Sequence, residues 1–264
     1  MSFLQAIVLA IIEGITEFLP ISSTGHMIAG STIMGISGNP FVKVFTVVIQ
    51  LGAIMSVVVL YWKRFWQTWK FYFVLLAGFV PAAVIGLLLN AKIDQLLDRV
   101  DVVGWSLIAG GFVLLFIDRY FSIAVDKGST LVTYSKSIRI GLFQCMALVP
   151  GVSRSAATII GGLTQGLNRT TAAEFSFFLA VPTMLAATAY KLLQFYLAGN
   201  SFGVTEISLL ALGNVVAFLV AMGAIKFFIG FLTRHGFKVF GYYRIGIGII
   251  ILLLYYFGAE IEMV

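Results

Sequence analysis

Long apolar segments separated by short charged loops dominate the pattern along this chain. Six of them are near the length of a membrane-spanning helix, at 41–62, 71–89, 102–117, 172–198, 207–231 and 241–257. A helix of about twenty apolar residues crosses a bilayer core of about 30 Å, and the short alternating segments of a membrane β-barrel are missing from the sequence. The pattern therefore predicts an all-α, polytopic membrane protein.

Two further apolar segments, 3–36 and 138–165, are interrupted midway by proline, glycine and hydroxyl residues. Each half of such a segment is too short to cross a bilayer alone. Both segments therefore predict re-entrant helix hairpins, whose irregular turns must face protein or a water-filled cavity.

The two halves of the chain resemble each other at an offset of 130 residues. Pro20 then falls on Pro150, and Ser23 falls on Ser153. Each repeat holds one hairpin and three spans, and because three is odd the second repeat must be inverted relative to the first. The prediction is one membrane domain over 1–264, with repeats over about 1–120 and 138–258.

Composition agrees with this class of protein. The 264 residues are 60% hydrophobic and only 11% charged, and their mean hydropathy is +1.04. The lone Cys145 excludes an internal disulfide and thiolate metal chemistry. No cleavable signal peptide is expected, since Glu13 and Glu17 interrupt the first apolar run.

The charged loops alternate in sign along the chain. Loops 63–70, 118–139 (which includes Lys127) and 232–240 are basic, whereas 90–101, 199–206 and the C-terminus with Glu260 and Glu262 are acidic. Lys and Arg gather in cytoplasmic loops of membrane proteins, so the net charge of +6 calls for no nucleic-acid partner. The alternation predicts that both termini lie outside the cytoplasm.

The first hairpin carries the most unusual polar residues. Glu13 and Glu17 are four residues apart, so a helix projects both carboxylates from one face. Buried together, the two acids need a shared proton or a bound cation. Beyond Pro20 follow three hydroxyl residues and one imidazole, namely Ser22, Ser23, Thr24 and His26. These residues predict acid–base chemistry, although the hydroxyls alone could equally cap the returning helix.

The second hairpin offers cationic and hydroxyl groups. Backbone N–H groups at a helix start attract anions, and Arg154 adds a planar donor pair that matches phosphate oxygens. The surrounding candidates for phosphate binding are Gly151, Ser153, Ser155 and Thr158, with Arg244 as a weaker one. An alternative is that Arg154 pairs with Glu13 or Glu17 and neutralises it, which is compatible with phosphate binding.

These motifs resemble the undecaprenyl-pyrophosphate phosphatase family associated with bacitracin resistance. E-G-x-x-E-F-L-P-I-S-S-T-G-H stands at 13–26, P-G-x-S-R-S at 150–155 and A-E-F-S-F at 173–177. Val152 and Ala156 depart from the family pattern, but neither change removes a charged group. The resemblance covers essentially the whole chain.

The resemblance implies an enzyme of the bacterial inner membrane that hydrolyses undecaprenyl diphosphate and recycles the lipid carrier for peptidoglycan. It implies Mg²⁺ or Ca²⁺ held by Glu13 and Glu17, an active site open to the periplasm, and it allows a homodimer. Glu17 and His26 would form the central catalytic pair, with Glu13, Ser23 and Arg154 also essential. The remaining hydroxyl residues and Arg244 would surround the diphosphate.

Two questions stay open at this level. The nucleophile is either water activated by Glu17 or His26, or the Ser23 hydroxyl activated by His26. A transporter or flippase of a phosphorylated lipid is the rival function, because inverted repeats with broken helices are also a transporter architecture.

Overall fold

The computed structural model describes residues 1–66, 68–97, 99–121 and 128–257, and this part of the chain is helical. Its β-structure is limited, within these ranges, to an isolated bridge between Ser129 and Leu167. Lys127, Glu260 and Glu262, which contribute to the predicted loop charges, lie outside the described residues. The predicted all-α class is confirmed.

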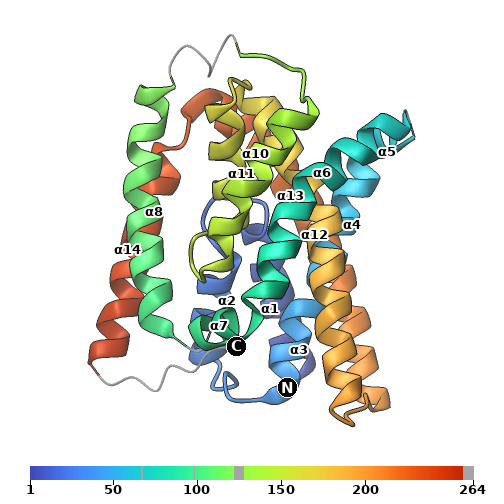
Figure 1. The fold of residues 1–264 in the computed structure, drawn as a ribbon. Helices are drawn as coiled ribbons and strands as arrows, with labels where there is room; N and C mark the ends of the chain where they lie inside the picture. Colours follow the sequence, from blue (N-terminus) through green and yellow to red (C-terminus); the bar gives the residue numbers. More distant parts are fainter. Residues whose placement is uncertain (67, 98, 122–127, 258–264) are drawn as a thin grey trace.

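The six predicted spans are present as helices long and apolar enough to cross a membrane (Figure 1). They are the broken helix α3–α4 (Pro40–Val48 and Gln50–Leu60), α6 (Trp69–Leu88), α8 (Val100–Tyr120), α12 (Arg169–Leu197), α13 (Val204–His235) and α14 (Lys238–Tyr256). Two short helices, α5 (Trp62–Phe65) and α7 (Asn90–Leu97), lie in the loops between them.

The two interrupted segments form helix–turn–helix hairpins. The first consists of α1 (Phe3–Thr16) and α2 (Ser23–Ile33); the second consists of α10 (Tyr134–Gln144), a 3₁₀ turn (Cys145–Leu148) and α11 (Arg154–Thr164). At 1.5 Å per residue, α1 is about 21 Å long and cannot cross a bilayer core. Figure 1 shows the hairpins approaching the middle of the molecule from opposite ends.

The span at 40–60 is broken at Ile49, a position without proline or glycine. The freed backbone groups find side chains on other spans. Gly52 N donates to Asn214 Oδ1 at 2.7 Å, and Thr188 Oγ1 donates to the Val47 carbonyl at 3.2 Å. A break inside an apolar span is therefore tolerated, because neighbouring helices satisfy its hydrogen bonds.

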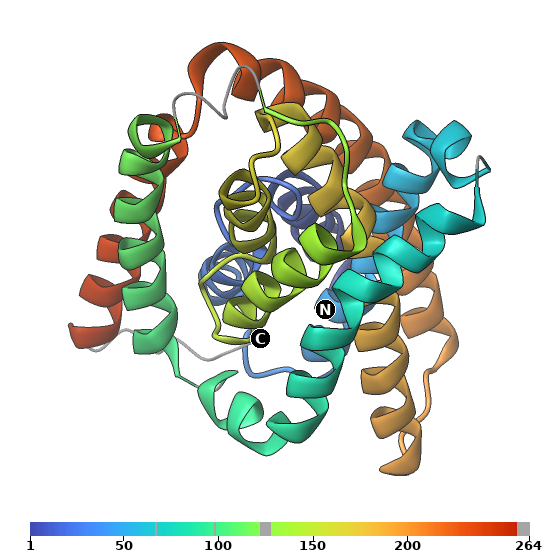
Figure 2. The ribbon, with the colours of Figure 1, turned by 45° about the horizontal axis from the view of Figure 1, so that its top comes forward.

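Small residues allow the helices to approach closely. A Cβ on Gly141 of α10 would lie 2.1 Å from the Gly78 carbonyl oxygen of α6, and a Cβ on Gly111 of α8 would lie 2.8 Å from the Gly241 carbonyl oxygen of α14. Between membrane helices, where lipid is as apolar as the side chains, such close packing drives association. The α8–α14 pair stands at one side of the hairpins (Figure 2).

Candidate active site

Glu17 and Arg154 bring the two hairpins together. Glu17 follows the last turn of α1, and Arg154 is the first residue of α11. Arg154 Nη2 donates to Glu17 Oε1 at 2.9 Å, and the two side chains are only 13% and 7% exposed. Removing one partner of such a buried ion pair costs about 3–5 kcal/mol, since the other charge is left unpaired. The pairing expected as one alternative is present.

Ser23 completes a three-residue arrangement around the Glu17 carboxylate. Its hydroxyl, on the first turn of α2, donates to Glu17 Oε2 at 2.6 Å. A carboxylate that accepts a short hydrogen bond from a hydroxyl is placed to take its proton. Glu17 therefore lies between a candidate nucleophile and a candidate phosphate-binding cation.

Glu13 lies one helical turn before Glu17 and is 1% exposed. Both of its carboxylate oxygens are buried and have no hydrogen-bond donor among the described residues. Its charge interacts with the charge of Glu17. A buried carboxylate in this position requires a proton or a cation, as the spacing of the two acids predicts.

Arg154 also contacts α12 and an aromatic ring. Nη1 donates to the Ser176 carbonyl at 2.9 Å, and the guanidinium lies 5.9 Å from the centroid of the Phe18 ring. Nε is buried without a partner among the described residues. Ser176 was not among the predicted site residues, although it belongs to the A-E-F-S-F motif.

His26 contacts Tyr243 and not Glu17 in the hydrogen bonds that the structure describes. Nδ1 lies 2.7 Å from the Ser22 carbonyl, which can only accept, so Nδ1 carries the proton. Nε2 lies 2.8 Å from the Tyr243 hydroxyl, and the two rings are nearly parallel. The expected Glu17–His26 pair is thus not in direct contact, and Tyr243 is a site residue that the sequence reasoning missed.

The two turns share an uncommon backbone conformation. Ser22 and Ser153, which precede α2 and α11, have φ of 69° and 73°. Left-handed φ is unfavourable for residues other than glycine, and such strain gathers at functional sites. Gly151, with φ of 87°, also uses this region. In both hairpins the backbone thereby turns so that the first residues of α2 and α11 reach the carboxylate of Glu17.

The predicted hydroxyl residues divide into two groups. Ser153 Oγ accepts from Ala156 N at 3.3 Å, Ser155 Oγ donates to the Leu19 carbonyl at 2.7 Å, and Thr158 Oγ1 lies 2.6 Å from Ser176 Oγ. Ser153 thus caps its own helix α11, Ser155 joins the second hairpin to the first, and Thr158 joins it to α12. Thr24, in contrast, is partly exposed on the first turn of α2.

Arg244 differs from its expected role as a phosphate contact. Its side chain is fully buried on α14, and its guanidinium donates only to backbone carbonyls, those of Pro20, Ser106, Leu107, Gly151 and Val152, at 3.0–3.3 Å. Five bonds use all five N–H groups of an arginine. Arg244 therefore holds the two hairpin turns against α8, and none of its donors remains for a phosphate.

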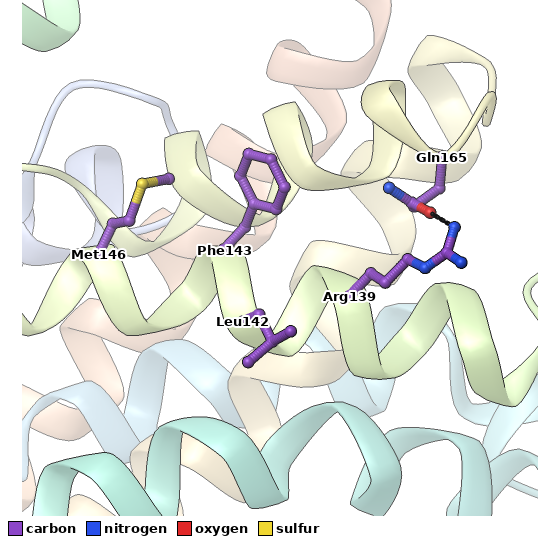
Figure 3. A pocket seen from close by; sticks show the side chains of 5 residues that line it. All are labelled: Arg139, Leu142, Phe143, Met146 and Gln165. Carbon is purple, nitrogen blue, oxygen red and sulfur yellow. Dashed lines mark hydrogen bonds between the residues drawn. The ribbon is translucent and has the colours of Figure 1, made fainter.

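A separate hollow lies on the outer face of the second hairpin (Figure 3). It encloses about 310 Å³ and is lined by Arg139, Leu142, Phe143, Met146 and Gln165. Its one cation is occupied, because Arg139 Nη1 donates to Gln165 Oε1 at 3.0 Å. None of the predicted site residues lines this mainly apolar hollow.

A metal would have few ligands besides the two acids. Among the described residues there is no group of three or more His, Cys, Asp or Glu side chains that could hold a metal ion. Glu13 nevertheless offers two oxygens without partners beside Glu17. Carboxylate, hydroxyl and water oxygens are the ligands that Mg²⁺ and Ca²⁺ prefer, so this donor set fits such an ion.

Comparison with known proteins extends over nearly the whole chain. The family described as "Bacitracin resistance protein BacA" matches residues 6–250. A protein of Flavobacterium psychrophilum is 59% identical, with 97% of each chain covered. A protein of Bdellovibrio bacteriovorus is 55% identical over both full lengths, and one of Aquifex aeolicus is 47% identical over 93% of this chain and 96% of its own. All three are named undecaprenyl-diphosphatase. With six apolar helices of spanning length and this match, the chain is a multi-pass membrane protein that belongs to the BacA family.

Proposed function

We propose that this chain hydrolyses undecaprenyl diphosphate to undecaprenyl phosphate and inorganic phosphate, which returns the lipid carrier to peptidoglycan and envelope polymer synthesis. The observation that carries the proposal is the buried arrangement of Ser23, Glu17 and Arg154, where two hairpins meet between membrane-type helices. The names of relatives at 47–59% identity support it.

Purified protein in detergent, given undecaprenyl diphosphate and Mg²⁺, should release one inorganic phosphate for each lipid consumed. Ser23→Ala is the matched control variant, because it removes the hydroxyl and leaves the Glu17–Arg154 ion pair in place. A folded protein that releases no phosphate but moves a phosphorylated lipid across vesicles would instead support the transporter.

The hydrogen bonds favour Ser23 as the nucleophile in this proposal. Its oxygen would bond to the terminal phosphorus while the bond from that phosphorus to the bridging oxygen breaks. Undecaprenyl phosphate then leaves, and Glu17 takes the hydroxyl proton. Water subsequently attacks the phosphoserine, inorganic phosphate leaves, and Ser23 regains a proton. Arg154 would stabilise the charge on the transferred phosphoryl oxygens.

The serine route and the direct water route make different predictions for one variant. With substrate labelled at the terminal phosphate, acid-quenched enzyme should retain label in the wild type and none in Ser23→Ala. Ser23→Ala with full activity would assign the attack to water.

Glu13 and Glu17 would hold the divalent cation, Mg²⁺ or Ca²⁺, in this proposal. Such an ion would neutralise charge on the diphosphate when bound. The support is the pair of Glu13 oxygens that are buried without donors. Glu13 would supply these two oxygens, and Glu17 would add a remaining lone pair while it keeps its hydrogen bonds to Ser23 and Arg154.

We further propose that the chain is an inverted repeat. In support, α1 packs on α13 as α10 packs on α6, and α8 packs on α14, so exchanging the halves preserves the contacts. The hairpins also agree in their caps, since Ser2 and Thr133 side chains each accept from the backbone N–H three residues later. The matching positive-φ residues, Ser22 and Ser153, give an offset of 131 at the turns, one more than the predicted 130.

The orientation that we propose has both termini and the opening of the active site at the periplasmic side of the inner membrane. The basic loops support it, because Lys and Arg gather on the cytoplasmic side. The prenyl tail would lie against apolar helix surfaces, and the hollow beside Leu142 and Met146 is a candidate for part of its path.

A further inference from the structure

A second cavity, lined by both polar and apolar residues, lies away from the active site at the basic end of the molecule. It encloses about 490 Å³ between the α5–α6 turn, residues 130–132 and the N-terminal end of α12. None of the candidate active-site residues lines it. Trp66 and Trp69 on the same turn are more than 80% exposed, as is typical of residues at a membrane–water interface. The cavity therefore lies at the depth of lipid headgroups.

Two cations line the cavity without a close acidic partner. Arg64 and Lys70 both have exposed side chains, and neither forms an ion pair among the described residues. Threonine hydroxyls, such as that of Thr171, lie among the lining residues. Guanidinium, ammonium and hydroxyl groups together are donors suited to phosphate oxygens.

The charges of the lining leave one positive charge uncompensated. Arg64 and Lys70 contribute two positive charges, and Glu174 contributes one negative charge. Glu174 interacts electrostatically with Arg64. A ligand with a single negative charge, such as a phosphodiester, would balance the set.

The buried part of the cavity lining is largely aromatic, since Phe175 and Phe178 are 4% and 5% exposed. Phe71 and Phe178 lie in an edge-to-face contact with ring centroids 5.3 Å apart, and Phe175 lies beside them in the lining. Apolar surface of this kind gains from contact with hydrocarbon and not with a free phosphate ion. Exposed donors together with buried apolar rings in one lining therefore match a molecule that is itself amphipathic.

We propose that this cavity binds the phosphodiester headgroup of one anionic phospholipid, with its first acyl carbons over the Phe71–Phe178 pair. Arg64 and Lys70 would contact the phosphate, and the lipid would join the α5–α6 turn to the start of α12. Basic residues near a membrane surface attract anionic lipids in general, so a built site must show more than this nonspecific attraction.

Native mass spectrometry of the detergent-solubilised protein, with equimolar phosphatidylglycerol and phosphatidylcholine, tests the proposal. The wild type should retain one phosphatidylglycerol in preference to phosphatidylcholine. Replacing both cations, Arg64→Gln with Lys70→Gln, should weaken this retention by about thirtyfold. Lys63→Gln is the matched control, because Lys63 is an exposed cation in the same loop that does not line the cavity.

A variant that keeps every charge separates the cavity from surface attraction. Val132→Trp fills the cavity and should abolish retention of phosphatidylglycerol, with unchanged elution in size-exclusion chromatography as the test of folding. Equal losses in Lys63→Gln and Lys70→Gln, full retention in Val132→Trp, or equal retention of the two lipids would overturn the proposal. Displacement of the lipid by inorganic phosphate at matched concentration would overturn it in favour of a free-anion site.

Discussion

Glu17 accepts hydrogen bonds from two groups, to which the proposed phosphoryl transfer gives different parts. Arg154 orients the carboxylate through one oxygen, while Ser23 presents its proton to the second oxygen. When substrate phosphate arrives, Arg154 still has its buried and unpartnered Nε–H to offer. Binding therefore need not break the Glu17–Arg154 pair, whose loss would leave a buried charge uncompensated.

Because the Glu13 carboxylate has no partner among the described residues, its replacement should make the protein more stable and less active. Without a cation, the buried Glu13 carboxyl must take up a proton, which costs free energy at neutral pH. Glu13→Gln removes this cost and should raise the unfolding free energy in EDTA by roughly 1–2 kcal/mol, while it lowers activity. It should also lose most of the stabilisation by Mg²⁺ that the wild type gains. Thermal unfolding in detergent, with and without Mg²⁺, measures both effects, and a less stable variant in EDTA would show that Glu13 has a partner.

The bonds of Arg244 to the two turns predict that it positions the site. A Cβ on Gly110 would lie 2.2 Å from Arg244 Nη2, so Gly110→Ala should displace the guanidinium without changing any charge. We expect kcat to fall at least tenfold with a smaller change in KM, because misplaced turns separate Ser23 from Arg154.

Gly246→Ala is the control for this prediction, since nothing lies within 4 Å of a Cβ there on the same helix as Arg244. It should keep wild-type kcat. A rise in KM alone in Gly110→Ala would return Arg244 to the phosphate contacts that the sequence suggested.

Residue types with unusual chemistry were predictable, but their partners were less so. Two acids and an arginine in apolar segments indicate contact with each other or with a ligand, because a charged side chain without a partner costs free energy inside a membrane. The Arg244 bonds run to carbonyls of separate segments, and backbone acceptors carry no sequence signal. Tyr243 was missed for a related reason, because its hydroxyl reaches His26 across 217 residues of sequence.

At the scale of elements, hydropathy located the spans and hairpins, but not the break inside the first span. The segment 41–62 contains no proline, and its interruption at Ile49 involves Asn214 and Thr188 from distant helices. In the proposed repeat, the positive-φ residues Ser22 and Ser153 are 131 residues apart, whereas the prolines at 20 and 150 give the predicted offset of 130. The local hydropathy pattern therefore predicted the helices, whereas the break in the first span involves hydrogen bonds to distant helices.

The hollow on the second hairpin predicts that KM depends on the length of the prenyl chain of the substrate. Leu142 and Met146 are about half exposed, so Leu142→Ala with Met146→Ala should leave folding intact. If the prenyl tail contacts them, KM for undecaprenyl diphosphate should rise roughly fivefold through lost apolar contact, while KM for geranyl diphosphate stays unchanged. Leu219→Ala, an equally exposed change on α13, is the control. Equal effects on both substrates would remove this hollow from the path of the tail.

At the scale of the whole molecule, the hairpins place a polar site in the interior of a lipid-facing bundle. The first helix of each hairpin packs against a helix of the other half, α1 on α13 and α10 on α6. Neither half therefore forms the site alone, because Glu17 and Arg154 come from different halves. The arrangement also separates two charged ends, and α5, which contains Lys63, lies at the basic end (Figure 1).

The charge asymmetry predicts the orientation of the protein in the cell. In a Cys145→Ser background, Asn200→Cys lies in the loop between α12 and α13, and Lys63→Cys lies at the opposite, basic end. Because basic loops remain in the cytoplasm, a membrane-impermeant maleimide should label Asn200→Cys in intact cells and Lys63→Cys only after permeabilisation. The reversed pattern would place the termini in the cytoplasm, and the proposed periplasmic opening of the site would then fail. Labelling of both in intact cells would contradict the assignment of these loops to opposite sides, on which the inverted repeat depends.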